Sequence, residues 1–253
     1  QHLAIAEFNL GVVAVHVLSG THPDERFRPW RRVKAPGCGA VATLTVADND
    51  GGERLLLLAA SYHDRGWHTQ SSVFALNQAG TAFEKHSEVP TVGAHDVEVM
   101  SLNGRHFAFF SNDKDERSTR QSSELFEWVG AFPSGRLKSR QKVQTDGAHA
   151  AEFFSSADGT RHFLAVANLG DREAGTYRRS SVVYAFDPSA SGGEEKMLRP
   201  LQKLPTLGAT DFLSFTIGGA TYLAVSNEQD DARGGDVGST IWVLRGSGPR
   251  EDL

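Results

Sequence analysis

Residues 93–98 read Gly-Ala-His-Asp-Val-Glu, and this pattern returns along the chain. It recurs from Gly147 as Gly-Ala-His-Ala-Ala-Glu, from Gly208 as Gly-Ala-Thr-Asp-Phe and, more faintly, from Gly39 as Gly-Ala-Val. The four starting glycines are 54, 54 and 61 residues apart in chain order. A period of this size, filled with short strand-like segments, is typical of a small β-sheet repeated around an axis, as in a β-propeller.

Each repeat unit contains the pattern of four strands. The first strand leads to a turn whose residues tolerate positive φ: Asn103-Gly104, Asp158-Gly159, Gly218-Gly219 or, in the first unit, residues 48–52. A strongly apolar second strand follows and ends in an asparagine that can bond the local backbone, at Asn112, Asn168 and Asn227. A polar loop, an alternating third strand and a charged fourth strand complete the unit. The sequence therefore predicts an all-β fold of four-stranded antiparallel blades.

The repeat divides the chain into about five blade equivalents within a single propeller domain, residues 1–253. We expect a partial blade over residues 1–38, three complete blades over 39–92, 93–146 and 147–207, and a second partial blade over 208–253. The two ends do not complement each other within one blade. We therefore expect the chain to form part of a larger chain, or to share strands with an assembly.

Charge and composition exclude several kinds of partner and site. A net charge of -5 gives no basic excess that would attract a nucleic acid, and no apolar run is long enough for membrane insertion. The single cysteine, Cys38, can form no internal disulfide, and we expect it to be buried. The sequence contains no Gly-x-Ser-x-Gly, phosphate-binding loop or His-Glu-x-x-His motif, so it assigns no catalytic and no cofactor-binding residue.

The order of these motifs resembles the epilepsy-associated repeat (EAR), also called the EPTP repeat, as in the secreted leucine-rich glioma-inactivated proteins. The resemblance rests on Gly-Ala-x-Asp-x-Glu, an aromatic-Leu-Ala-Val-Ala-Asn strand, Ser-Ser-x-Val-Tyr and a Leu-Gln-Lys-Leu-Pro-Thr-Leu-Gly-Ala junction. It is clearest over residues 147–227. The resemblance implies a seven-bladed ring, an extracellular or cell-surface location, and binding through a propeller face without enzymatic turnover.

Four acidic residues fall on the predicted innermost strands, which line the channel of a propeller: Asp96, Glu98, Glu152 and Asp211. Calcium accepts six to eight oxygen ligands in a flexible geometry, so these carboxylates are candidate calcium ligands. Family members tend to carry an Asp-Trp-Glu triplet here, and this chain departs from it in every copy. The alternative role for the four residues is hydrogen bonding at strand ends. No cofactor is required, and calcium is the candidate ion.

The histidines favour structural roles. His95 and His149 occupy the same position in successive repeats, as a strand-start residue would. The densest local group, His63, Asp64 and His68, matches no zinc motif, and we expect a solvated loop there.

A row of basic residues shares one face of a predicted fourth strand: Arg136, Lys138, Arg140 and Lys142. Such a row could dock an acidic partner. The favoured interpretation is that charge on an outermost strand prevents pairing with other sheets.

These observations favour a non-catalytic module that recognises another protein through loops that vary while the strands repeat, chiefly residues 113–120 and 170–179. The alternative is a structural subunit of a large assembly, whose incomplete blades are finished by other chains. A third possibility is an enzyme with a site at the channel mouth, although nothing in the sequence demands it.

Overall fold

The computed structural model describes residues 2–19, 26–190, 195–231, 234–235 and 237–245. Within these residues the fold consists of antiparallel β-sheets and one 3-10 turn, η1 (Phe8–Leu10). The strands form three four-stranded and two three-stranded sheets, which we number blade one to blade five in chain order. None of the described helical segments is long and apolar enough to cross a membrane.

The three central blades follow one plan, in which each strand pairs with the next along the chain. Blade two consists of β4 (Cys38–Ala47), β5 (Glu53–Ser61), β6 (His68–Leu76) and β7 (Phe83–Val92). Blade three consists of β8 (Ala94–Leu102), β9 (Arg105–Asn112), β10 (Ser122–Val129) and β11 (Arg136–Gln144). Blade four consists of β12 (Ala148–Ser155), β13 (His162–Asn168), β14 (Ser180–Phe186) and β15 (Leu198–Pro205).

The two end blades have three described strands each. Blade one consists of β1 (His2–Glu7), β2 (Val12–Ser19) and β3 (Arg26–Lys34). Blade five consists of β16 (Ala209–Ile217), β17 (Ala220–Asn227) and β18 (Thr240–Val243). Because β3 leads directly into β4, as β7 leads into β8, the strands of blade one correspond to the second, third and fourth of a complete blade. The three complete and two partial blades predicted from the repeat are therefore present.

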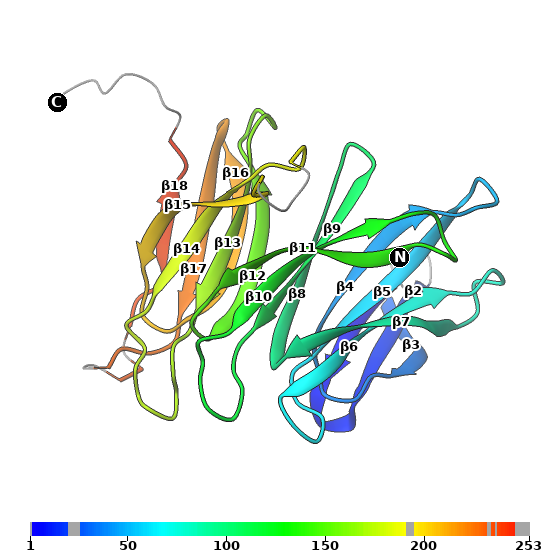
Figure 1. Cartoon of the computed structure of the whole chain (residues 1–253), viewed down its shortest axis with the longest axis horizontal. Helices are drawn as coiled ribbons and strands as arrows, with labels where there is room; N and C mark the ends of the chain where they lie inside the picture. Colours follow the sequence, from blue (N-terminus) through cyan, green and yellow to red (C-terminus); the bar gives the residue numbers. More distant parts are fainter. Residues whose placement is uncertain (1, 20–25, 191–194, 232–233, 236, 246–253) are drawn as a thin grey trace.

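The first strands of successive blades lie next to one another. β4 contacts β8, β8 contacts β12, and β12 contacts β16, whereas the fourth strands β7, β11 and β15 form the outer edges of their sheets. Figure 1 shows the sheets side by side, with blade one and blade five at opposite ends of the row. Sheets that radiate from a shared set of inner strands are the architecture of a β-propeller, as the repeat predicts.

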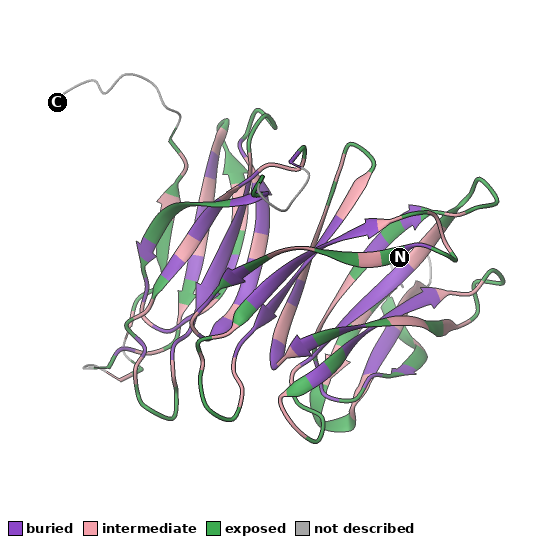
Figure 2. Cartoon of the chain, viewed as in Figure 1, coloured by how far each residue is buried: buried purple, intermediate pink, exposed green. Residues whose placement is uncertain are grey.

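Most of the core lies between neighbouring blades and is built on the second strands. Leu58 of β5, Phe110 of β9 and Trp128 of β10 belong to one buried cluster between blades two and three. Phe109 and Leu164 belong to the next cluster, between blades three and four. Figure 2 shows the second strands as largely buried. Both faces of these strands are covered, which explains their continuous apolar runs.

Repeated asparagine side chains join blades three, four and five each to the blade before it. Asn112 donates a hydrogen bond from Nδ2 to Ser122 O (2.7 Å) and accepts one at Oδ1 from Val92 N (3.2 Å). Asn168 and Asn227 make the corresponding pairs of bonds in blades four and five. The predicted backbone-bonding role of these residues is confirmed, and one side chain ties its own third strand to the end of the preceding blade.

Blade two starts earlier than residue 39, the start that the repeat pattern predicts. Gly37 and Gly93 have φ of 68° and 53°, and a Cβ on either would overlap a backbone carbonyl of the loop that follows the second strand. The bulge after the first residue of β4 also matches the bulge at the start of β8. Gly37, and not Gly39, is therefore the equivalent of Gly93, and the first strand of this blade begins at Cys38.

Candidate functional site

The loops that join second and third strands lie on one face of the propeller, at the bottom of Figure 1. We call this the loop face. It is formed by residues 62–67 of blade two, 113–121 of blade three, 169–179 of blade four and the described part of 228–239 in blade five. These loops differ in length and charge while the strands beneath them repeat. Binding residues are often found on such loops because a rigid scaffold positions them.

Between blades two and three the loop face is held together by aromatic and polar contacts. Tyr62 donates a hydrogen bond from Oη to Asp113 Oδ2 (3.2 Å). The Lys114 ammonium lies 4.7 Å from the centre of the Trp67 ring, within cation–π range. Burial raises the pKa of Asp113 to about 6, and the Tyr62 hydrogen bond opposes this rise. The loops of these two blades therefore form one continuous surface.

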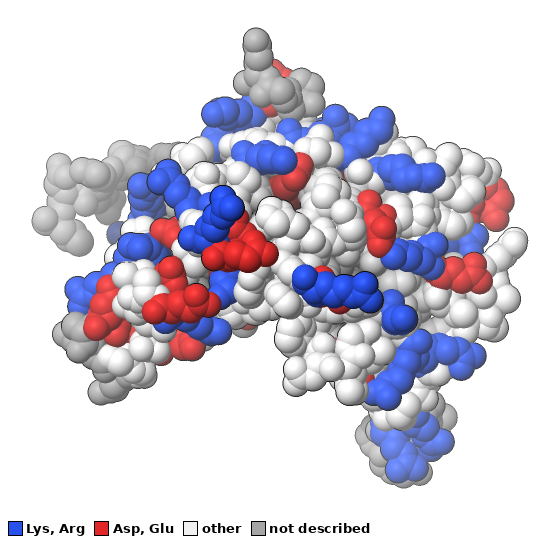
Figure 3. Space-filling view, turned by 60° about the horizontal axis from the view of Figure 1, so that its bottom comes forward, with Lys and Arg blue, Asp and Glu red and all other residues white. Residues whose placement is uncertain are grey.

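Ion pairs continue this surface across blades four and five. Lys114 Nζ lies 2.6 Å from Glu173 Oε1, and Arg172 Nη2 lies 2.5 Å from Glu228 Oε2. Most of the Glu173 side chain is exposed, and the side chains of Arg172 and Glu228 are partly exposed, so these three groups are accessible to a partner. Figure 3, in which this face comes forward, shows acidic side chains lying among basic ones over the surface. The arrangement offers charges of both signs to a protein surface and gives no single-sign field for a polyanion.

The four predicted calcium ligands lie on three neighbouring inner strands: Asp96 and Glu98 on β8, Glu152 on β12 and Asp211 on β16. Asp96 accepts a hydrogen bond at Oδ2 from Ala151 N (2.9 Å). Glu152 accepts hydrogen bonds at Oε1 from Ser214 N (2.9 Å) and from Ser214 Oγ (2.7 Å). These two carboxylates therefore tie each inner strand to the next, which is the alternative role considered from the sequence.

Burial and mutual repulsion perturb these carboxyl groups. Burial raises the pKa of Asp96 to about 6, and burial together with the neighbouring Asp96, Glu152 and Asp211 carboxylates raises the pKa of Glu98 to about 8. Burial also raises the pKa of Asp211. Among the described residues, the group of potential ligands whose atoms lie within 4.8 Å of one another is on the loop face. It includes none of the four inner carboxylates. A calcium ion held by the inner carboxylates therefore stays a prediction.

Replacing Glu98 with glutamine should flatten the pH dependence of stability. Because the folded-state pKa of about 8 exceeds the ordinary 4.5, the folded chain keeps a proton that the unfolded chain releases. The free energy of unfolding of the wild type should therefore fall as pH rises from about 4.5 to about 8. Over the same range the free energy of unfolding of Glu98→Gln should fall by less. Urea denaturation at about pH 5 and about pH 8.5 measures the difference. Equal losses in the two proteins would contradict the assignment.

The repeated histidines form a stack along the inner strands. The His95 and His149 rings have their centroids 3.6 Å apart. His95 Nδ1 lies 3.0 Å from His149 O, and His149 Nδ1 lies 2.8 Å from Thr210 O. Burial, with a contribution from His149, lowers the pKa of His95 to about 3, so the ring is neutral near pH 7 and donates to the next strand. The two side chains thus have the structural role that their repeat position indicates.

Two of the four basic residues in the row on β11 are paired with carboxylates of their own blade. Arg140 Nε lies 2.7 Å from Glu127 Oε2, and Lys142 Nζ lies 3.7 Å from Glu124 Oε2. Both glutamates belong to the adjacent strand β10. An acidic partner would have to displace these carboxylates, so the geometry favours the edge-strand interpretation.

One group of side chains is not predicted from the sequence, namely His68, Asp115 and Glu116. Along the chain, the neighbours of His68 are His63 and Asp64. The two acidic partners follow about fifty residues later and reach His68 because blades two and three pack together. No local spacing could have revealed this group.

Comparisons with known proteins agree with the repeat pattern. The family model of the EPTP domain matches residues 197–240. A thrombospondin-type laminin G domain and EAR repeat-containing protein of Mus musculus is 30% identical over 88% of this chain and 42% of its own length. The Homo sapiens protein of the same name is 29% identical over 57% of this chain and 20% of its own length. The chain thus spans less than half of the curated relatives that it matches.

Two solved structures resemble the fold. A putative 6-phosphogluconolactonase from Bacteroides fragilis matches with a TM-score of 0.57 and 17% identity, over 96% of this chain and 70% of that chain. A Penicillium chrysogenum α-L-arabinanase matches with a TM-score of 0.52 and 11% identity, over 93% of this chain and 78% of that chain. At these identities the likeness shows the fold alone. The family model and the two EAR repeat-containing relatives, and not these structures, lead to the conclusion that this chain belongs to the EAR repeat family, whose repeat is also called EPTP.

Proposed function

We propose that the chain is a non-catalytic recognition module that binds another protein through the loop face. The observation that carries the proposal is that loops of different length and charge, 113–121 and 169–179, are tied across blades into one surface. A rigid surface with exposed charges of both signs can bind a protein with little ordering cost on binding. Membership in a repeat family also supports an interaction role.

An extracellular or cell-surface location fits this proposal. The curated relatives are named for a thrombospondin-type laminin G domain, which supports such a location. The absence of catalytic turnover is part of the proposal as well. In its support, the polar side chains Asp96 and Glu152 of the inner strands are engaged in ties between strands. The solved structures named as enzymes support the fold and carry no activity over to this chain.

A structural role in a larger assembly is the second candidate. It is favoured by apolar side chains on blade five that are more than half exposed, namely Leu213, Ile217 and Ile241. Another sheet packed on this side would cover them, as each inner blade covers its neighbour. Sedimentation of the purified chain tests this role, because a folded monomer at micromolar concentration would argue against it.

The recognition proposal is tested by substitutions on the loop face. The double variant Arg172→Ala with Glu173→Ala should weaken binding of the labelled chain to intact cells by tenfold or more, since a few exposed interface side chains carry most binding energy. The matched control is Arg199→Ala with Lys203→Ala on the outer strand β15, which should bind like the wild type. Flow cytometry over a concentration series gives the three affinities. Equal binding by all three proteins, or no binding by the wild type, would contradict the proposal.

A further inference from the structure

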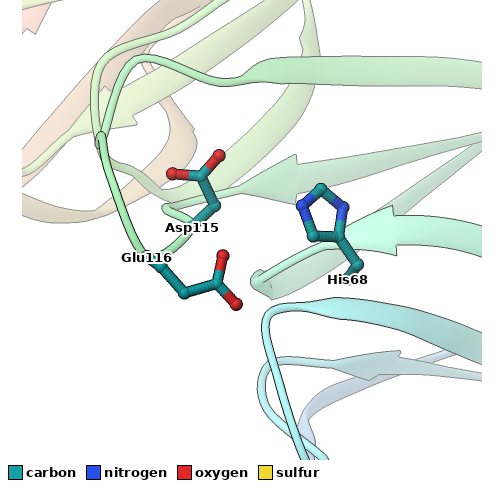
Figure 4. A group of neighbouring side chains, drawn as sticks. All are labelled: His68, Asp115 and Glu116. Atoms are coloured by element: carbon teal, nitrogen blue, oxygen red, sulfur yellow. The ribbon is translucent and has the colours of Figure 1, made fainter.

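A group of potential metal ligands lies on the loop face, where blades two and three meet. His68 is the first residue of β6, and Asp115 and Glu116 lie in the loop between β9 and β10. One ligand atom of each side chain lies within 4.8 Å of the other two. Figure 4 shows Asp115 and Glu116 on one loop, with the ring of His68 lying opposite them. The group thus combines an imidazole from one blade with two carboxylates from the next.

Two of the three side chains are not committed to other contacts. Among the described residues, neither His68 nor Glu116 makes a side-chain hydrogen bond or ion pair. Asp115 is fixed in place, because its Oδ1 accepts hydrogen bonds from Arg117 N (2.8 Å) and from Ser118 N (2.8 Å). One ligand is therefore anchored by its own loop, and the two other ligands are exposed.

The chemistry of the three groups selects a class of ion. An imidazole nitrogen with two carboxylate oxygens suits zinc and related divalent transition metals, which bind at about 2.0–2.2 Å. Calcium prefers six to eight oxygens, and this group offers an imidazole instead. The distances between the ligand atoms must shorten by rotation of the exposed His68 and Glu116 side chains. Three protein ligands would leave a fourth position for water.

We propose that His68, Asp115 and Glu116 form a binding site for a zinc-like divalent transition metal. The ion joins β6 of blade two to the loop of blade three and fixes residues 113–121 on the loop face. The site is independent of the calcium predicted for the inner carboxylates, since none of its ligands lies on an inner strand. It is also independent of protein recognition, because it requires no partner.

Titration calorimetry with Zn²⁺ tests the site on the metal-free chain. The wild type should bind about one ion in this site, and His68→Gln and Glu116→Gln should each weaken it at least tenfold. Asp115→Asn should do the same without unfolding the loop, because the amide oxygen can still accept the two backbone hydrogen bonds. The matched control is His16→Gln on β2, which should bind like the wild type. Circular dichroism confirms that each variant is folded.

Three results would overturn the proposal. The first is no Zn²⁺ binding by the wild type at about 100 μM ion, a concentration at which a three-ligand site should fill. The second is equal binding by the wild type and His68→Gln, which would place the ion elsewhere. The third is Ca²⁺ binding that depends on Asp115 and Glu116 but not on His68, which would make the group an oxygen-only site. Loss of cell binding in the Arg172 and Glu173 variant has no bearing on these outcomes.

Discussion

Replacing Phe110 with alanine is expected to lower the free energy of unfolding by about 3–5 kcal/mol. Phe110 is fully buried in β9 and belongs to the cluster that joins blades two and three. Its ring packs edge-on against Phe126, with the centroids 5.6 Å apart. Alanine would remove these contacts and leave a cavity between two sheets that cannot easily close around it. Urea denaturation monitored by tryptophan fluorescence measures the loss.

Ile217→Ala is the control for this experiment. Ile217 is 63% exposed at the end of β16, so its truncation should change stability by no more than about 0.5 kcal/mol. Similar losses in the two variants would show that the interface between blades does not hold the fold together. A denaturation curve for Phe110→Ala that coincides with that of the wild type would contradict the packing of blades two and three described above.

Gly147→Ala is expected to have the second large effect. Gly147 has φ of 66°, and a Cβ there would overlap the backbone oxygen of Gly170. The left-handed conformation costs an alanine about 1–2 kcal/mol, and displacement of the packed backbone adds about 1–3 kcal/mol. Because residues 169–179 belong to the loop face, the same substitution should also displace that loop. Denaturation measures the first effect, and amide exchange of residues 169–179 measures the second.

A second glycine separates the two causes. Gly159 has φ of 69°, and nothing lies within 4 Å of the position that its Cβ would take. Gly159→Ala should therefore pay only the conformational cost of about 1–2 kcal/mol. If Gly147→Ala and Gly159→Ala were equally destabilised, the close approach of the Gly147 backbone to the Gly170 backbone would be excluded.

The strand order was predictable because turn chemistry and apolar runs act locally. Asn103-Gly104 and Gly218-Gly219 have positive φ at both positions, as their composition predicts for tight hairpins. At Asp158-Gly159 only the glycine has positive φ. Here Asp158 instead accepts hydrogen bonds from nearby groups such as Thr160 N, in a longer turn. Local signals thus placed the turn correctly but did not fix its type.

Contacts between blades determine where blade two begins and which side chains come together at the candidate sites. Gly39 falls where blade three has His95, and a Cβ on Gly39 would lie 3.2 Å from His95 O. Position 39 is therefore a glycine because the neighbouring strand β8 passes close to it, and not because a repeat starts there. The sequence placed Asp96 and Glu152 on inner strands correctly, but their bonds to the next strand became evident only in three dimensions. The same holds for His68, whose carboxylate neighbours belong to another blade.

Native-state amide hydrogen exchange, followed by mass spectrometry, tests most directly whether rigid radiating blades hold the variable loops. We expect the slowest exchange in the second strands β9 and β13, faster exchange in the outer strands β11 and β15, and the fastest in loops 113–121 and 169–179. Outer strands as protected as β9 and β13, or loops as protected as the strands, would contradict this expectation.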